Sequence, residues 1–231
     1  HNGVKHPLVD GKLRPRMAVL DTRVLDSLPK SLIADGGFDA ICHGVEAYVA
    51  KNAGAISDCL ALEAFRRVMA LLPASWGGDK SCRLRIHEAS TMAGMAFNRA
   101  GLGLCHAMAH ALGGAFHLPH GRLNAILLPH VISCNAHVCG KKYAELARAA
   151  GIGGSADTIA VRNLRNGLIR LRKELNLPTT LKEAGIPPQK LWYHSKEIVE
   201  ATLKDPCLQT NPVRCEAFQI RRILEAVSGH G

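Results

Sequence analysis

The chain has few aromatic residues, and this scarcity excludes one class of partner. Phe, Trp and Tyr make up 4% of its 231 residues, whereas the net charge is +10. A surface that binds single-stranded nucleic acid interleaves aromatic side chains with cationic ones. Here the basic residues are spread along the chain, and over Asp157–Leu175 they face away from leucines at helical spacing, as on a solvated amphipathic helix. We therefore expect no nucleic-acid partner.

Long hydrophobic runs are also missing. No apolar run approaches the roughly 20 residues that a membrane-spanning helix needs, so we expect no membrane partner. The eight cysteines show no paired spacing of the kind that holds structural zinc. Because several lie in apolar, helical contexts, we expect buried free thiols and a cytoplasmic location; these residues are Cys42, Cys59, Cys105 and Cys134.

A glycine-rich nucleotide loop is absent as well. No Gly-x-Gly-x-x-Gly motif follows a predicted strand, so the residues that bind a dinucleotide stay unknown. The chain begins at His1 without Met, and the one strand that we predict is the short segment Met17–Asp21.

Helical patterns dominate what is present, which predicts a mainly α fold. The first ligand-type residues lie on a predicted helix over Phe38–Lys51. A second helix should start at Ser57 and stop before Pro73, because proline lacks the N–H that a helix interior requires. Two glycines, Gly113 and Gly114, should end the helix that starts at Leu104.

Three segments bring together residues that bind metals. Asp39 and His43 are four residues apart, as are His106 and His110, so each pair shares one helix face. His120 follows in a turn between Pro119 and Gly121. One carboxylate and three imidazoles suit a borderline divalent metal such as iron or zinc.

A bland interpretation competes with this one. Twelve histidines in 231 residues produce some four-residue spacings by chance. The stretch from Ala93 to His130 nevertheless places four imidazoles among Ala, Leu, Gly and Met. Buried polar groups need partners, and a metal ion satisfies several of them at once.

Two longer motifs carry a family resemblance. The segment GLGLCHAMAHALGGAFHLPHGRLNAILLPHV resembles the signature of the iron-containing (group III) alcohol dehydrogenases, and GGFDAICHGVEAYVA resembles that family's upstream metal segment. The similarity runs from about Pro7 to the C-terminus. Within the family, GLGLCHAMAH and DPCLQTNP are most similar to the branch used in ethanolamine or propanediol breakdown.

The resemblance implies a role for individual residues. Fe²⁺, with Zn²⁺ as the alternative, would be held by Asp39, His43, His106 and His120. His110 matches a histidine beside the metal and is the candidate catalytic proton relay. The substrate would lie against Phe97 and Cys207.

The resemblance also implies a domain organisation. Residues 31–231 would form the all-α metal-binding catalytic domain, and residues 1–30 would be a remnant that joins it to an N-terminal α/β domain. That missing domain would bind NAD or NADP. Glu46 and Tyr48 lie on the first metal-bearing helix, and we expect them to anchor it rather than to react.

The expected function is a metal-dependent, NAD(P)-linked oxidoreductase that interconverts a short-chain alcohol and its aldehyde. Full-length members of the family are expected to be homo-oligomers, in the cytoplasm or associated with a bacterial microcompartment. Two alternatives remain. The isolated chain could be a non-catalytic metal-binding helical domain. A zinc-dependent hydrolase is less favoured, because such enzymes place Glu after the first histidine and this chain has Ala107 there.

Overall fold

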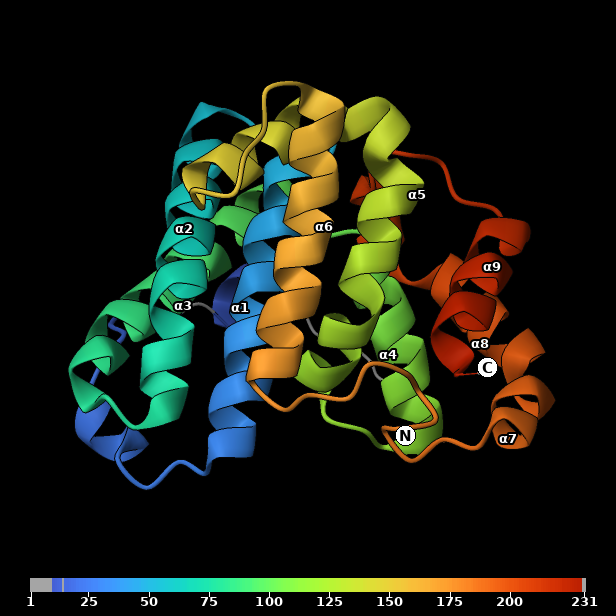
Figure 1. Cartoon of the computed structure of the whole chain (residues 1–231), viewed down its shortest axis with the longest axis horizontal. Helices are drawn as coiled ribbons and strands as arrows, with labels where there is room; N and C mark the ends of the chain where they lie inside the picture. Colours follow the sequence, from blue (N-terminus) through green and yellow to red (C-terminus); the bar gives the residue numbers. More distant parts are fainter. Residues whose placement is uncertain (1–9, 14, 230–231) are drawn as a thin grey trace.

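The computed structural model describes residues 10–13 and 15–229, and within these residues the regular structure is entirely helical. Figure 1 shows the arrangement of the helices. Their bounds are α1 (Lys30–Val49), α2 (Ala55–Gly77), α3 (Arg83–Ala100), α4 (Leu104–Phe116), α5 (His120–Ala149), α6 (Asp157–Glu174), α7 (Pro188–Tyr193), α8 (Ser195–Lys204) and α9 (Ala217–Ser228). Short 3-10 turns are η1 (Gly11–Leu13), η2 (Thr22–Leu25), η3 (Lys80–Cys82) and η4 (Pro206–Thr210).

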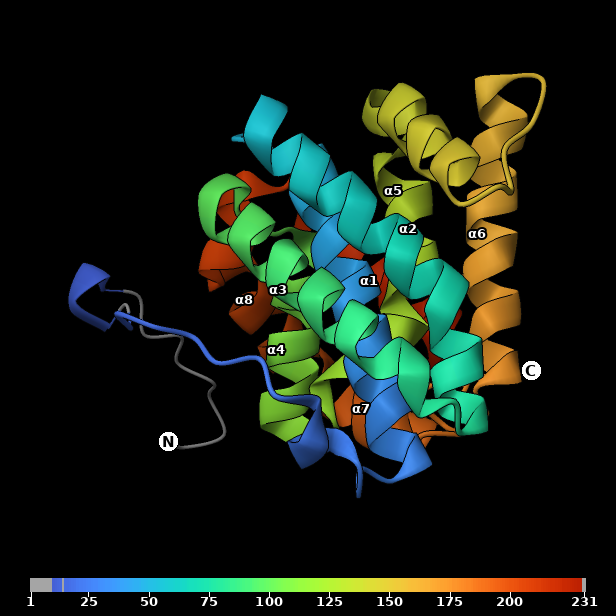
Figure 2. The same ribbon diagram turned by 90° about the vertical axis from the view of Figure 1, so that its left-hand side faces the viewer.

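Helix α1 lies at the centre and is buried along most of its length. It packs against α2 and α3 on one side and against α5 on the other, and α6 lies along α5 (Figures 1 and 2). Small residues permit the close packing of α1 on α2: a Cβ at Gly44 would lie 3.0 Å from the carbonyl oxygen of Ala61. Helix α4 packs against α5 and α8.

The predicted strand at Met17–Asp21 is wrong. Residues 15–21 have no regular structure, and residues 15–20 are exposed. A strand requires a neighbouring strand to take its backbone hydrogen bonds, and the described residues provide none. The segment before η2 instead extends away from the helices (Figure 2). The proposed boundary near residue 30 coincides with the start of α1 but stays a prediction, and residues 1–9 of the proposed remnant lie outside the described residues.

Two predicted helix ends are also wrong. Helix α2 continues through Pro73 to Gly77, because Leu72 and Ser75 pack in the interior on either side of it. It ends where Gly78 takes the left-handed conformation with φ 114°. Helix α4 continues through Gly113 and Gly114 to Phe116, and His117 supplies the left-handed residue at its end, with φ 56°.

Some smaller predictions also need correction. His120 is not in a turn but is the first residue of α5. Cys59 is exposed, because it lies on the outer face of α2, whereas Cys42 and Cys105 are buried as predicted. All eight cysteines are free thiols. Among the described helices, none is both long and apolar enough to cross a bilayer.

Candidate metal centre

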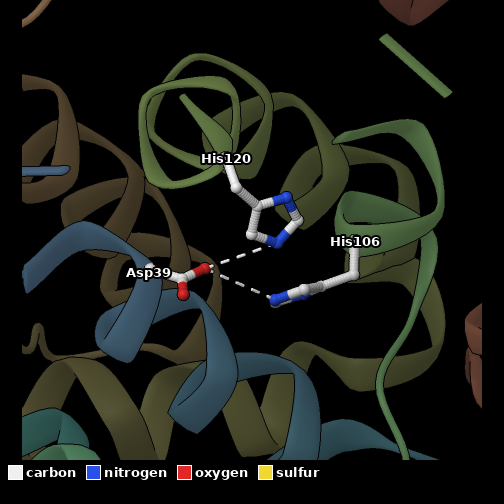
Figure 3. A group of neighbouring side chains, drawn as sticks. All are labelled: Asp39, His106 and His120. Carbon is white, nitrogen blue, oxygen red and sulfur yellow. Dashed lines mark ion pairs between the residues drawn. The ribbon is translucent and has the colours of Figure 1, made fainter. Parts of the chain in front are cut away.

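Three of the predicted ligands converge from three different helices. The carboxylate of Asp39 of α1 faces the imidazoles of His106 of α4 and His120 of α5, as Figure 3 shows. Asp39 Oδ1 is 3.6 Å from His106 Nε2 and 3.5 Å from His120 Nε2. All three ligand atoms lie within 4.8 Å of one another.

These distances fit a metal ion. In a tetrahedral site with bonds of about 2.1 Å, neighbouring ligand atoms are about 3.4 Å apart. The separations of 3.5 and 3.6 Å are close to that value. The donors are a carboxylate and imidazoles, which bind iron and zinc. The arrangement can therefore hold a divalent metal with little movement of these three side chains.

His43, the fourth predicted ligand, lies beside this group rather than within it. Its Nδ1 is 3.8 Å from Asp39 Oδ2, and its ring stacks on His106 at 4.6 Å between centroids. On its other side it contacts the ring of Phe97 at 4.5 Å. His43 is not part of the group whose ligand atoms converge, and its role as a ligand stays a prediction.

The charges of the site arise from burial and from pairing. Burial opposes ionisation of Asp39, but the hydrogen bond with His106 and the surrounding imidazoles hold its pKa well below the usual range. Burial lowers the pKa of His43 to about 4, and the positive charge of His106 adds to this effect. His43 is thus a neutral imidazole, the form that can bind a metal.

Glu46 is the partner of His106, and the sequence pattern did not identify it as such. Its Oε2 lies 2.6 Å from His106 Nδ1, in a site where both side chains are almost fully buried. The same carboxylate accepts backbone N–H groups of Gly103 at 3.0 Å and Cys105 at 2.7 Å. Glu46 therefore caps the N-terminus of α4 and orients His106, which agrees with the anchoring role expected for it.

The position of Glu46 carried a signal that could have been used. Asp39, His43 and Glu46 follow the spacing i, i+4, i+7, which places all three on one face of α1. A polar stripe on a buried helix must meet polar partners on other elements. The spacing could thus have predicted that Glu46 faces the ligands, although not that it caps α4.

Asn124 is a second residue that the sequence did not identify. It lies one turn after His120 on α5 and is fully buried. Its Nδ2 donates to Asp39 Oδ1 at 2.7 Å and is 3.4 Å from His106 Nε2. Asn124 thus holds two of the candidate ligands in place.

His110 belongs to a neighbouring group with Asp205 and Cys207. Its Nδ1 is 2.9 Å from Asp205 Oδ2, and its ring stacks on His120 at 5.1 Å between centroids. The backbone N–H of Cys207 donates to Asp205 Oδ1 at 2.8 Å. Burial, reinforced by the Asp205 charge, raises the pKa of Cys207, so this thiol is not an activated nucleophile.

With this geometry established, comparison with known proteins gives a consistent result. Residues 33–228 match the family model described as "Fe-containing alcohol dehydrogenase family, C-terminal". The 1-propanol dehydrogenase PduQ of Salmonella typhimurium is 42% identical over 96% of this chain and 62% of its own length. The NADPH-dependent butanol dehydrogenase of Clostridium saccharobutylicum is 38% identical over 97% of this chain and 58% of its own length.

Solved structures show the same relationship. The iron-containing alcohol dehydrogenase of Thermococcus thioreducens superposes with a TM-score of 0.88 at 33% identity, over 97% of this chain and 57% of that one. The chain therefore spans less than two thirds of the length of these relatives.

Proposed function

The chain belongs to the iron-containing alcohol dehydrogenase family, and from that premise we propose that it supplies the metal-binding half of an NAD(P)-linked oxidoreductase. The proposed reaction interconverts a short-chain alcohol and its aldehyde. The observation that supports it best is the convergence of Asp39, His106 and His120 from three helices.

The proposed ligands of Fe²⁺ are Asp39, His43, His106 and His120, and Zn²⁺ suits the same donors. When bound, the metal supplies Lewis acidity at a substrate oxygen and the nicotinamide supplies the hydride chemistry. Glu46 accepts a hydrogen bond from His106 Nδ1, so that the neutral imidazole would offer its Nε2 lone pair to the metal. NAD or NADP would bind to the part of the protein that this chain does not include.

His110 is the proposed proton relay. The carboxylate of Asp205 is hydrogen-bonded to Nδ1 of His110. This leaves Nε2 of His110 to exchange a proton with the substrate oxygen or with solvent. Phe97, whose ring packs on His43, and Cys207 would form the walls against which a small apolar chain lies.

The proposed class of substrate rests only on the names of the relatives. One is described as acting on 1-propanol and another on butanol, so we expect a short primary alcohol here. Assembly into a homo-oligomer, a cytoplasmic location and association with a bacterial microcompartment are further predictions. A non-catalytic metal-binding domain is the rival for the isolated chain, because its relatives are considerably longer.

Metal titration tests the proposal directly. Calorimetry of the chain with Fe²⁺ under nitrogen, and with Zn²⁺, should show one tight site. Replacing His120 with alanine removes a ligand and should weaken binding by at least about 100-fold, an effect as large as or larger than the loss of an outer-shell partner. His137→Ala is the matched control, since His137 lies exposed on the same helix. Unchanged stoichiometry and affinity in His120→Ala would refute the site.

A further inference from the structure

A cavity of about 170 Å³ lies between α1, α2 and α3, and the segment around η2 forms one of its walls. Most of the residues that line it are apolar; they include Leu25 and Leu28 of that segment, Ile33 of α1, Leu72 of α2 and Ile86 of α3. None of the lining residues is a proposed metal ligand. The cavity is therefore distinct from the metal centre.

The volume of the cavity limits what it can hold. In another protein, an engineered apolar cavity of about 150 Å³ holds one benzene molecule, which has about the bulk of six carbon atoms. A cavity of about 170 Å³ therefore has room for about six to eight non-hydrogen atoms.

A buried guanidinium also lines this cavity. The side chain of Arg83, the first residue of α3, is only 9% exposed. Its Nη1 donates to the carbonyl oxygen of Leu25 and lies 3.5 Å from Asp26 Oδ1. Its Nε is buried, and no atom of the described residues accepts a hydrogen bond from it. A buried donor without an acceptor costs free energy, which an acceptor inside the cavity would recover.

The open edge of this guanidinium suits a carboxylate. A carboxylate binds arginine through two parallel N–H bonds from one edge of the guanidinium. Because Nη1 of Arg83 bonds to Leu25, the edge that carries Nε is the one without an acceptor. His87 and Ser90 lie one and two turns further along α3 and line the same cavity. Polar donors thus follow one face of α3 along the cavity.

From these observations we propose that the cavity binds a straight-chain carboxylate of about four to six carbons, which matches both the volume and the guanidinium. The carboxylate pairs with Arg83, and the alkyl chain lies against Leu72 and Ile33. A small inorganic anion would use Arg83 but would leave the apolar walls unused. The site is separate from the metal centre and does not depend on the proposed oxidoreductase activity.

A series of ligands tests the two halves of this recognition. Calorimetry of the zinc-loaded chain with sodium hexanoate should give one site with a Kd below about 1 mM. From butanoate to hexanoate, the affinity should rise about fourfold with each buried CH₂ group. Hexanamide has the same bulk without the charge and should bind at least about tenfold more weakly, because it loses the charge-assisted hydrogen bonds. Equal affinity for acetate and hexanoate, or for hexanamide and hexanoate, would overturn the proposal.

Gly36 offers a way to fill the cavity without disturbing the core. It lines the cavity, it is exposed, and a Cβ built there would meet nothing within 4 Å. Because leucine is the better helix former inside α1, Gly36→Leu should fold and should weaken hexanoate binding at least about tenfold. Gly140→Leu is the matched control, since Gly140 of α5 is equally open but does not line the cavity. It should leave the affinity unchanged.

Replacing Arg83 tests the carboxylate partner. Arg83→Met keeps the apolar stem and should reduce the affinity for hexanoate to that for hexanamide. Arg85→Met, at an exposed arginine on the same helix, should change nothing. A carboxylate held by the zinc ion would behave differently: its binding would survive Gly36→Leu and disappear when the zinc is removed. That pattern, or no binding of hexanoate at millimolar concentration, would refute the cavity as a carboxylate site.

Discussion

At the scale of single residues, the centre depends on two carboxylates, Glu46 and Asp205, that are not proposed metal ligands. Each of them holds a histidine of the site in place. The carboxylate of Glu46 accepts hydrogen bonds from two backbone N–H groups at the start of α4 and from the imidazole of His106. The carboxylate of Asp205 likewise accepts hydrogen bonds from His110 and from the backbone N–H of Cys207. Each carboxylate therefore fixes the position of a helix or turn together with the tautomer of a histidine.

Replacing Glu46 should weaken metal binding without removing a ligand. In Glu46→Gln the amide can no longer accept hydrogen bonds with both of its terminal atoms, so His106 loses its fixed tautomer and α4 loses part of its cap. We expect a decrease in metal affinity of about 10- to 100-fold, typical of outer-shell partners. Competition with a chromogenic zinc chelator measures it.

Glu145→Gln is the control for that experiment, because it makes the same change in charge at a carboxylate that accepts from Tyr48. The orienting role of Glu46 would be wrong if the Glu46→Gln and Glu145→Gln variants bound zinc with equal affinity.

His110 should separate metal binding from proton transfer. His110→Ala removes the partner of Asp205 but none of the proposed ligands, so the chain should still bind one metal ion. In the protein that also carries the dinucleotide domain, turnover should fall by about 10²- to 10⁴-fold and recover in part with added imidazole. Loss of the metal together with activity would instead make His110 a ligand.

At the scale of helices, the sequence predicted the element type well and the element ends poorly. Leu164, Leu168 and Leu171 are buried on α6, as their spacing predicts. Inside a helix, a tertiary contact can replace a missing backbone partner. Pro129 lies inside α5 and has no N–H for the carbonyl of Ala125, and Arg172 supplies the donor at 3.2 Å. Arg172 is consequently buried, although its place among the arginines of α6 predicted a solvated side chain.

Within the site, the residues that could be predicted from the sequence differ from those that could not. The spacing of Asp39, His106 and His120 and the resemblance were sufficient to name residues that do converge. Asn124, and the contact of Glu46 with α4, could not be predicted, because their partners come from other helices at sequence separations that no periodicity encodes.

The contact between α5 and α1 beside the site should tolerate no added methyl group. Gly121 lies against the backbone of Asp35, and a Cβ there would overlap the carbonyl oxygen of Asp35. Because backbone cannot move aside as a flexible side chain can, Gly121→Ala should destabilise the chain by about 1–3 kcal/mol or more. Urea unfolding followed by circular dichroism measures the change.

Gly140 provides a matched control on the same helix, since nothing lies within 4 Å of a Cβ built there. Gly140→Ala should be neutral or stabilising by up to about 1 kcal/mol, because alanine is the better helix former. Equal effects of the two substitutions would mean that α5 and α1 are not in this close contact.

At the scale of the whole molecule, metal binding and folding are coupled through pH. In the metal-free chain, burial acts against protonation of His106, but hydrogen bonds with Asp39 and Glu46 outweigh it and raise the pKa of His106 to about 9. A raised pKa in the folded state contributes stability that is complete below about 6.5 and is lost as the pH rises through about 9. A metal ion needs the neutral imidazole, so its contribution increases over the same range.

The difference in unfolding temperature between zinc-loaded and metal-free chain should therefore widen from about pH 6.5 to about pH 9. Differential scanning calorimetry at several pH values in this range measures it. Asp39→Asn, which removes a proposed ligand, should abolish the difference at every pH. A difference that stayed constant with pH would contradict proton competition at His106.

The length of the chain relative to its relatives leads to the last prediction. The matched family model is the C-terminal domain, and the chain spans 58% of the butanol dehydrogenase and 57% of the Thermococcus thioreducens protein. Dinucleotides bind where backbone N–H groups of a glycine-rich loop meet the phosphates after a strand, and the described residues contain no strand. We therefore expect the 231-residue chain to bind metal but to show neither NAD(P) binding nor oxidation of ethanol, 1-propanol or 1,2-propanediol.

Calorimetry with both dinucleotides, and an absorbance assay for NAD(P)H, would measure these two properties. The same assays on a protein that also contains the residues encoded by the DNA immediately upstream should show both NAD(P) binding and alcohol oxidation. Tight dinucleotide binding with turnover by the chain alone would show that this helical half contains its own cofactor site.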